Sequence, residues 1–385
     1  MAGPLRVGLI GGGLMGREAA VAIARWSALE DHPVRPVVAG VCDTDPERLA
    51  WFERIETAAR LTVDHRELLT ADEIDVVYIA VPHHMHEQLY LDAAAAGKDF
   101  LAEKPLGIDL AASERIVAAI ERAGVFVRCS SEMPFFPGAQ LAIEEIRSGA
   151  LGRPIEAQAS FLHSSDLDPR KPINWKRQTR YCGELGVIGD LGVHALHVPL
   201  RLGWLPRTVY AVTQDIVRER PGPDGRPVPC DTIDNATLIA AVDDEERDFP
   251  LTIETKRIAP GEANTWILRA VGMDGGVEFS TRSPKTVRRF VLDDGRQAWQ
   301  EHQVGSQSVF PTVTGAIFEF GFADAILQMW AAFLAERAGA LGARFGCLTP
   351  QEALEAHRVF AAALRSSQSG RAEPTRGFVP GAKSA

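Results

Sequence analysis

The amino-acid sequence predicts an α/β protein in which a doubly wound parallel sheet is followed by a second, α+β domain with a large, mainly antiparallel sheet. Two observations support this prediction. Apolar strands alternate with helical segments over about the first 130 residues, as in parallel sheets whose faces are covered by helices. From about residue 150 the chain instead shows strands of alternating polarity, separated by turns such as "MDGG" and "DDG". This second pattern indicates antiparallel pairing.

Apolar runs and helix signals place the elements of the first domain. Asp45 is the expected N-cap of a helix because Pro46 follows at the first helical position, and Gly97 closes a later helix. Strands are expected at residues 5–12, 34–43, 74–82, 98–105 and 125–130, and helices at residues 14–29, 45–59, 83–97 and 109–124. This alternation predicts helices on both faces of the sheet.

The second part of the chain is expected to begin with a helix near residues 137–149 and to close with helices at about 315–338 and 350–368. Strands are expected between them at residues 153–163, 207–215, 234–242, 249–258, 265–272, 275–281 and 286–292. Segment 218–231 holds four prolines and is expected to be a loop. The predicted domains are residues 1–130 and 131–369, followed by a flexible or extended tail at 370–385.

The composition excludes several classes of protein. The chain has 385 residues, of which 46% are hydrophobic and 24% charged, and its net charge is −10. This balance predicts a globular protein that does not bind nucleic acid or an anionic membrane. The N-terminus does not resemble a signal peptide, and the five cysteines form no CxxC pair. We therefore expect a reduced, cytoplasmic protein.

A glycine-rich turn joins the first strand to the first helix. In "GLIGGGLMG", Gly11 is expected to make the tight turn, Gly13 to let the backbone approach a pyrophosphate, and Gly16 to allow close helix–strand packing. The amides near Leu14 and Met15 would present the positive end of the helix to the phosphates. A glycine-rich turn without a ligand is the alternative.

Asp43 ends the second strand and is expected to accept hydrogen bonds from the ribose hydroxyls of a dinucleotide. Its carboxylate would repel a 2′-phosphate, and no arginine follows it immediately. The sequence therefore predicts NAD as the cofactor, in preference to NADP. In the alternative interpretation Asp43 only begins the "DTDP" turn.

Two further motifs end predicted parallel strands, and ligands bind at the carboxyl edge of such sheets. "VPHHMHEQL" places Pro82 and His86 at this edge, and "LAEKPLG" places Glu103 and Lys104 there, before a Pro105 that could form a cis peptide. The three histidines of the first motif lack a converging acidic or cysteine ligand at a convincing spacing, so no metal is expected. The alternative for the second motif is a surface Glu–Lys pair.

The stretch "GELGVIGDLGVHALHVPL" (183–200) holds three ionisable groups among glycine and aliphatic residues. Asp190, His194 and His197 lie at i, i+4 and i+7 and would share one helix face. One interpretation is a helix capped by Asp190 with two core histidines. The other is an acid/base pair that acts on a substrate.

In this order, "GLIGGGLMG", "AVPHHMH", "AEKPLG", "IRSGALGRP" and "GDLGVH" resemble the Gfo/Idh/MocA family of NAD(P)-dependent oxidoreductases over roughly residues 5 to 369. The resemblance implies an N-terminal Rossmann domain that binds the dinucleotide and a C-terminal domain that binds substrate. The open sheet of the latter often joins subunits, so a homo-oligomer, dimer or tetramer, is expected.

The resemblance also implies a reaction and a catalytic group consisting of Lys104, Asp190 and His194. His194 would be the general base that takes the proton of a sugar, glycoside or cyclitol hydroxyl while hydride leaves the same carbon for C4 of nicotinamide. Asp190 and Lys104 would orient the hydroxyl and tune the base.

The chain departs from the family pattern in several places. "GVIGD" replaces a glycine triplet, and His197 stands where many members have an acid, so it is either a substrate contact or a core residue. "DPRKPINWKRQTR" (168–180) is a basic stretch in an acidic protein. Its expected substrate contacts are Trp175, Lys176, Arg177 and Arg180. Arginine suits carboxylate, sulfonate or phosphate, so an anionic sugar is predicted; a solvated loop or a subunit contact is the alternative.

Two alternative functions would use the same NAD site, and the motifs fit the first of them better than the second. A redox-neutral, NAD-dependent glycosidase would oxidise a ring hydroxyl, eliminate the aglycone, add water and reduce the ketone, and could act on an anionic or sulfonated glycoside. A non-catalytic NAD sensor would be expected to lack Lys104 or His194, and both are present.

Overall fold

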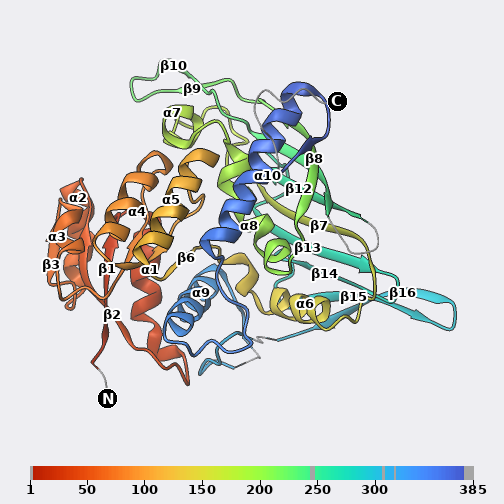
Figure 1. The fold of residues 1–385 in the computed structure, drawn as a ribbon, viewed down its shortest axis with the longest axis horizontal. Coiled ribbons are helices and arrows are strands. Elements are labelled where there is room, and N and C mark those ends of the chain that lie inside the picture. The colour runs from red at the N-terminus through yellow and green to blue at the C-terminus, as the bar shows by residue number, and fades with distance from the viewer. Residues whose placement is uncertain (1–2, 243–247, 306–307, 316–317, 377–385) are drawn as a thin grey trace. The chain divides into compact units, whose positions relative to one another are not determined.

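The computed structural model describes residues 3–242, 248–305, 308–315 and 318–376, and the chain forms two compact units (Figure 1). The first unit comprises Met1–Gly107, Ala111–Gln140 and Gly305–Gln351. The second unit comprises Ile108–Leu110, Leu141–Val304 and Glu352–Ala385. Each unit has its own sheet.

The first unit is built on a parallel sheet whose strands lie in the order β3-β2-β1-β4-β5-β6. This is the strand order of a Rossmann fold, in which the direction of strand addition across the sheet reverses between the parallel strands β1 and β4. The predicted strands are confirmed, and the strands span Leu5–Ile10 (β1), Pro36–Cys42 (β2), Arg60–Thr62 (β3), Val76–Ile79 (β4), Asp99–Ala102 (β5) and Val127–Cys129 (β6). Strand β3 was not predicted, because three residues are too few to show an apolar pattern.

Helices cover this sheet, although three predicted segments, 14–29, 45–59 and 83–97, each divide into a 3₁₀ turn and a shorter α-helix. The segment 14–29 divides into α1 (Leu14–Ala24) and a 3₁₀ turn, η1 (Trp26–Ala28), because the chain tightens to bury Trp26, whose indole N–H donates to the Val34 carbonyl at 2.8 Å. The segment 45–59 likewise divides into α2 and η2, and Asp45 caps α2 by accepting from the Glu47 amide. The helices of this part are α2 (Pro46–Leu49), η2 (Ala50–Arg54), α3 (His65–Leu69), η3 (His83–Met85), α4 (His86–Ala95) and α5 (Leu110–Ala123).

A late helix, α9 (Phe322–Arg337), belongs to the first unit. It is buried from Ala325 to Ala335, packs against α1, and shares one core with Val7 and Leu9 of β1. The division at residue 131 therefore has to be corrected, because residues 305–351 return to the first core. A helix this apolar on all sides must be covered all round, and the core beside the parallel sheet provides that cover.

The second unit is built on a sheet with the strand order β16-β15-β14-β13-β7-β12-β11-β8-β17. Among the described strands, the neighbours pair antiparallel except for β7 and β12, which run parallel. Its strands span Pro154–His163 (β7), Pro206–Gln214 (β8), Asn235–Val242 (β11), Phe249–Lys256 (β12), Asn264–Gly272 (β13), Gly276–Ser280 (β14), Thr286–Asp293 (β15), Arg296–Gln303 (β16) and Glu373–Pro374 (β17). The mainly antiparallel sheet is confirmed, and β15 and β16 form a long hairpin in Figure 1.

Two expectations for this unit need correction, and a third, for the tail, agrees with the structure. The strand β16 went unpredicted because its sequence, "RQAWQEHQ", is almost entirely polar. The proline-rich segment contains a two-stranded hairpin, β9 (Glu219–Pro221) and β10 (Pro227–Pro229), in addition to its loop. The tail is extended at β17, which pairs with β8; residues 377–385 lie outside the described part.

The stretch that contains Asp190 forms helix α8 (Val187–Arg201), which packs on β7 and β12. Gly186 is its N-cap, with φ of 52°, so Asp190 lies inside the first turn and does not cap the helix. The helix is buried from Val187 to Leu200. Helix α10 (Pro350–Ser369) packs closely at Gly192, where an added Cβ would lie 2.6 Å from the Phe360 ring. The other helices of the unit are α6 (Pro137–Arg147), η5 (Trp175–Arg177) and α7 (Thr179–Cys182).

Within the part of the chain that the structure describes, no helix has both the length and the apolar character needed to cross a bilayer.

Candidate functional site

The glycine turn after β1 has the backbone geometry that a dinucleotide requires. Gly11 has φ of 107°, and an added Cβ would lie 2.1 Å from the Ala80 carbonyl oxygen. A Cβ on Gly16 would lie 2.0 Å from the Gly11 carbonyl oxygen, whereas a Cβ on Gly13 would meet no atom within 4 Å. Gly11 and Gly16 therefore permit close packing, and Gly13 leaves space beside the backbone.

Helix α1 begins at this turn with its amides exposed. Gly13 is the N-cap, and among the described residues no side chain caps the helix and no acidic side chain lies in its first turn. Leu14 is 72% exposed, and Met15 packs against the core. The first amides of a helix have no partner within it and carry a partial positive charge. This end of α1 fits a pyrophosphate.

Asp43 lies directly beside the turn and is nearly buried. Its Oδ2 accepts from the Gly12 amide at 2.7 Å, and its Oδ1 accepts from the Asp45 amide at 2.9 Å. The Arg48 guanidinium lies 3.6 Å from the same Oδ2. The carboxylate is thus oriented by the glycine turn, as expected for a ribose contact.

The ends of β4, β5 and β6 bring a polar network together around Glu103. Its Oε1 accepts from the Tyr78 hydroxyl and the Ser130 hydroxyl, both at 2.6 Å, and its Oε2 accepts from the Lys104 amide at 3.2 Å. The Lys104–Pro105 peptide is cis. Glu103 therefore fixes the backbone of Lys104 from within the unit and is not the surface pair of the alternative interpretation.

Glu132 is a second buried carboxyl at this edge, and the sequence analysis missed it. It follows β6 at the start of the 3₁₀ turn η4 (Met133–Phe135). Burial, together with the negative charge of Glu103, raises the pKa of Glu132 from its ordinary 4.5 to about 7. The pattern "SSEMP" contains no recognisable motif that could have indicated this.

His86 is the first residue of α4, four residues after Pro82, and is completely buried. Its Nδ1 lies 2.7 Å from the Pro105 carbonyl oxygen and its Nε2 lies 3.0 Å from the Val81 carbonyl oxygen. Burial lowers the pKa of this imidazole. The ring joins the two loops that follow β4 and β5, and a direct contact of His86 with the cofactor stays a prediction.

In the second unit, Asp190 lies between two cations. The Lys176 Nζ lies 2.9 Å from its Oδ1 and 3.1 Å from its Oδ2, and an Arg257 guanidinium nitrogen lies 3.3 Å from Oδ2. Arg257 also donates to the Lys176 carbonyl at 2.8 Å. Arg257 directly follows strand β12 and was not predicted as a site residue, because no neighbouring residue indicates its approach to α8.

His194 lies one turn after Asp190 on α8 and packs edge-on against Phe161 of β7, with ring centroids 5.0 Å apart. Its backbone carbonyl accepts from the Trp266 indole N–H at 2.9 Å. Both His194 and His197 are buried, and His197 is completely so. The helix therefore places Asp190 and His194 on one face, as predicted, while burial favours the core interpretation of His197.

The basic stretch 168–180 is not uniformly solvated. Arg177 is completely buried and pairs with Asp234 and, at 3.6 Å, with Asp166. Buried Arg220 of β9 stabilises the start of the same stretch by donating a hydrogen bond to the Asp168 carbonyl at 2.8 Å. These contacts favour a structural role for Arg177, which the sequence had suggested as a substrate contact.

The other predicted contacts in this stretch lie nearer to the surface. Lys176 is partly exposed and faces the Trp175 ring at 5.6 Å from its centroid. Arg180 is exposed, donates to the Gln178 side chain at 2.6 Å, and lies over the Tyr181 ring. The structure therefore brings Lys176, Arg257, Asp190 and His194 together in the second unit, while Lys104 and the glycine turn belong to the first unit.

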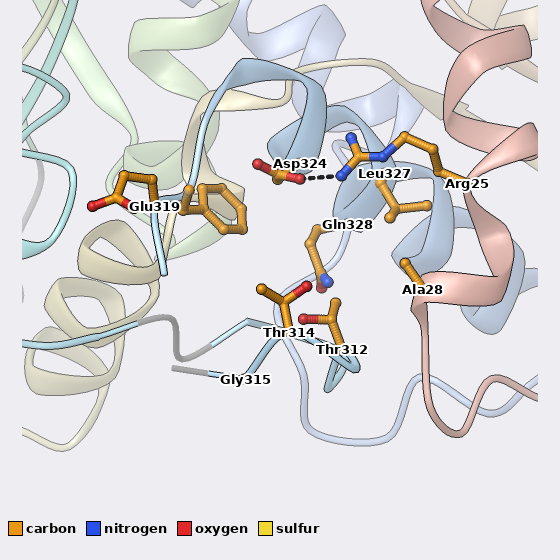
Figure 2. Close-up of a pocket in the computed structure, with 10 residues that line it drawn as sticks. Arg25, Ala28, Thr312, Thr314, Gly315, Glu319, Asp324, Leu327 and Gln328 are labelled. Atoms are coloured by element: carbon orange, nitrogen blue, oxygen red, sulfur yellow. Dashed lines mark hydrogen bonds and ion pairs between the residues drawn. The ribbon is translucent and has the colours of Figure 1, made fainter. Parts of the chain in front are cut away.

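A hollow within the first unit lies apart from these residues (Figure 2). It lies between the end of α1 and the start of α9, where Arg25 points toward Asp324 and forms an ion pair with it. Gln328, on its wall, bonds to the backbone of Phe310. None of the predicted site residues lines this hollow, so it is not the candidate site.

Family models match both parts of the chain. Residues 5–131 match the model described as "Oxidoreductase family, NAD-binding Rossmann fold", and residues 139–278 match the model described as "GFO/IDH/MocA C-terminal domain". The first match contains the glycine turn, Asp43 and Lys104, and the second contains Asp190, His194 and Arg257. The NAD cofactor predicted from the sequence is thereby confirmed.

Curated relatives cover different shares of the chain. Levoglucosan dehydrogenase of Pseudarthrobacter phenanthrenivorans is 28% identical over 295 residues, which are 72% of this chain and 73% of the relative. D-apiose dehydrogenase of Paraburkholderia graminis is 32% identical over 161 residues, 42% of this chain and 41% of the relative. Inositol 2-dehydrogenase 4 of Saccharopolyspora erythraea is 34% identical over 162 residues, 42% of this chain and 46% of the relative.

Solved structures share the whole fold. Levoglucosan dehydrogenase in complex with NADH and L-sorbose matches with a TM-score of 0.87 and 23% identity, covering 98% of this chain and 100% of that one. An NAD binding oxidoreductase from Klebsiella pneumoniae matches with a TM-score of 0.85 and 27% identity over the same shares. The fold class predicted from the sequence is therefore confirmed.

Proposed function

Because this chain belongs to the Gfo/Idh/MocA oxidoreductase family and carries its NAD-binding Rossmann domain, we propose that it is an NAD-dependent dehydrogenase of a sugar, glycoside or cyclitol. The observation that carries the proposal is the pairing on α8, where Asp190 is held by two cations one helical turn before His194. The relatives named after levoglucosan, D-apiose and inositol support this class of substrate.

The proposed roles follow from the chemistry of alcohol oxidation. NAD, when bound, accepts hydride at C4 of its nicotinamide. A ring nitrogen of His194 takes the proton of the substrate hydroxyl, because imidazole is the side chain best suited to accept a proton near neutral pH. Asp190 accepts a hydrogen bond from substrate and orients it, and Lys104 donates to the oxygen that loses the proton.

The charge around Asp190 supports an anionic substrate. Lys176 and Arg257 together outweigh the single carboxylate, so the cluster carries a net positive charge. Arg177 cannot add to this charge, because Asp234 and Asp166 surround it. We therefore assign recognition of a carboxylate or phosphate group on the sugar to Lys176 and exposed Arg180, whose charge-assisted hydrogen bonds each contribute about 1.5–3 kcal/mol.

A panel of neutral sugars, uronates, sugar phosphates and their glycosides, incubated with NAD, tests the activity. We expect stoichiometric NADH formation with at least one class, and a higher kcat/KM for the anionic member of a matched pair. Aglycone release without net NADH would instead identify the redox-neutral glycosidase, which could use the same residues. Failure of every polyol and glycoside to react would contradict the proposal.

His194→Ala tests the base directly. We expect kcat to fall by about two to four decades, the usual contribution of general acid–base catalysis. The Kd for NAD should stay unchanged, because the glycine turn and Asp43 belong to the other unit. Unaltered turnover on the true substrate, or a melting temperature that shows the variant to be unfolded, would remove the support for this role.

Assembly and compartment are further parts of the proposal. The face of the second sheet that α8 does not cover exposes Tyr210 and Val212 of β8 and Ile239 of β11, and this apolar strip supports a homo-oligomer joined through the sheet. The five cysteines form no disulfide in the described part of the chain, which supports a cytoplasmic location. Light scattering of the purified chain and of Ile239→Lys tests the first point; a monomeric parent protein would contradict it.

A further inference from the structure

The carboxylate that should select NAD is partly neutralised. Asp43 accepts two backbone hydrogen bonds, from the amides of Gly12 and Asp45, and faces the Arg48 guanidinium at 3.6 Å. A carboxylate in this position favours NAD because it binds the ribose hydroxyls and repels a 2′-phosphate. That repulsion depends on the electrostatic potential beside the carboxylate, which the dipoles of two amides and the charge of a guanidinium make less negative.

Arg48 reaches this position because α2 begins only three residues after Asp43. The first turn of α2 carries Arg48 back toward the glycine turn, where a Cβ on Gly12 would lie 3.5 Å from the Cβ of Arg48 and 3.4 Å from Oδ2 of Asp43. Arg48 therefore lies beside the glycine turn, whose Gly12 amide donates to Asp43.

The guanidinium is held loosely and faces solvent. Its side chain is 53% exposed, and its two ion pairs, with Asp43 at 3.6 Å and Asp45 at 3.3 Å, are long. Exposed pairs of this kind contribute little to stability, so the guanidinium can turn toward another anion at little cost. Its planar set of donors can bind a phosphate through two parallel hydrogen bonds.

We propose that Arg48 is a specificity-determining residue that gives this NAD site measurable affinity for NADP by binding the 2′-phosphate beside Asp43. The inference rests on the cofactor site alone and is independent of the substrate proposed above. The sequence predicted NAD in preference to NADP partly because no arginine directly follows Asp43. The arginine that contacts Asp43, Arg48, lies instead on the next helix, α2.

Isothermal titration of the full chain with NAD and with NADP tests the proposal, without any need for turnover. We expect the unmodified protein to bind both cofactors, with NAD bound more tightly. Arg48→Gln should weaken NADP binding about ten- to hundredfold, the loss of one charge-assisted hydrogen bond, and should change NAD binding less than about threefold.

Arg54→Gln is the matched control, because Arg54 is also exposed and lies on η2, over the Trp51 ring at 5.0 Å from its centroid. It should leave the ratio of the two dissociation constants unchanged. Three results would overturn the proposal: equal losses for both cofactors in Arg48→Gln, a matching NADP loss in Arg54→Gln, or no NADP binding by the unmodified protein. Because none of these depends on a sugar, they are distinct from a failure of the proposed dehydrogenase activity.

Discussion

The ammonium nitrogen of Lys176 lies 2.9 Å from one carboxylate oxygen of Asp190 and 3.1 Å from the other. Arg257 approaches the second oxygen from the end of β12, at 3.3 Å. The two cations differ in environment, because the Lys176 side chain is 39% exposed and that of Arg257 only 4%. One partner of Asp190 is therefore partly exposed to solvent, and the other is buried.

Substitution of the two cations should separate these roles. Lys176→Met should leave the melting temperature nearly unchanged, since a partly exposed ion pair contributes about 1 kcal/mol or less, and should reduce kcat/KM for the true substrate. Arg257→Met should destabilise the fold by about 3–5 kcal/mol, because it leaves a buried carboxylate and a carbonyl with fewer partners. Denaturant unfolding and steady-state kinetics measure both effects.

The kinetics of Lys176→Met also show whether the ammonium charge binds an anionic group of the substrate or orients Asp190. A loss confined to anionic sugars would assign Lys176 to the substrate anion. An equal loss on neutral sugars would assign it to the orientation of Asp190. A large loss of stability in this variant, with catalysis intact, would contradict both roles.

Substitution can separate the packing role expected of Gly16 from the cofactor-binding role expected of Gly13. Gly16→Ala should destabilise the protein by about 1–3 kcal/mol, because its Cβ would lie 2.0 Å from the Gly11 carbonyl oxygen. Gly13→Ala should keep or slightly raise stability, since its Cβ meets no atom within 4 Å and its φ is −72°. The same methyl group should weaken NAD binding at least about tenfold, because it fills the approach to the pyrophosphate.

Melting temperatures and NAD titrations of these two variants measure the difference. NAD binding by Gly13→Ala that equals that of the unmodified protein would contradict the assignment of this turn to the pyrophosphate. An unfolded Gly13→Ala would contradict the open space that the structure shows beside it.

Local patterns predicted most of the fold because the apolar runs of β1, β2, β4 and β5 and the capping of α2 by Asp45 are set by neighbouring residues. Contacts between distant segments could not be predicted in this way. Arg257 reaches Asp190 from 67 residues further along the chain, and α9 packs on a core that began at residue 7. Arg48 was missed for a different reason, since its approach to Asp43 depends on the first turn of α2.

Substitution of Arg177, the buried arginine of the basic stretch, tests whether this residue contacts substrate, as the sequence predicts, or stabilises the fold. Arg177→Met should destabilise the protein by about 3–5 kcal/mol, because it leaves Asp234 and Asp166 buried without this cation. Arg170→Met is the control, since Arg170 is 88% exposed and its solvent-screened pair with Asp168 should contribute little to stability. Urea unfolding of both variants measures the difference; a stable Arg177→Met with a raised KM would instead restore the substrate role.

The raised pKa of Glu132 predicts how stability depends on pH. Its pKa is about 7 in the folded protein, against an ordinary 4.5, because burial and the charge of Glu103 disfavour the carboxylate. Between these two values the folded state binds a proton that the unfolded state has released, so this residue lowers stability as pH rises from about 4.5 to 7. One pKa unit corresponds to about 1.36 kcal/mol, and the whole effect is about 3 kcal/mol.

Glu132→Gln should remove this dependence, because the amide stays neutral at every pH. We expect the variant to match the unmodified protein near pH 4.5 and to exceed it by up to about 3 kcal/mol above pH 7. Denaturant unfolding at several pH values measures this difference, and Glu114→Gln, at an exposed position on α5, is the control that should show no such change. If Glu132→Gln were no more stable than the unmodified protein at alkaline pH, Glu132 would have to be stabilised as a carboxylate, and its neighbours Glu103 and Lys104 would then have to be arranged to favour that charge.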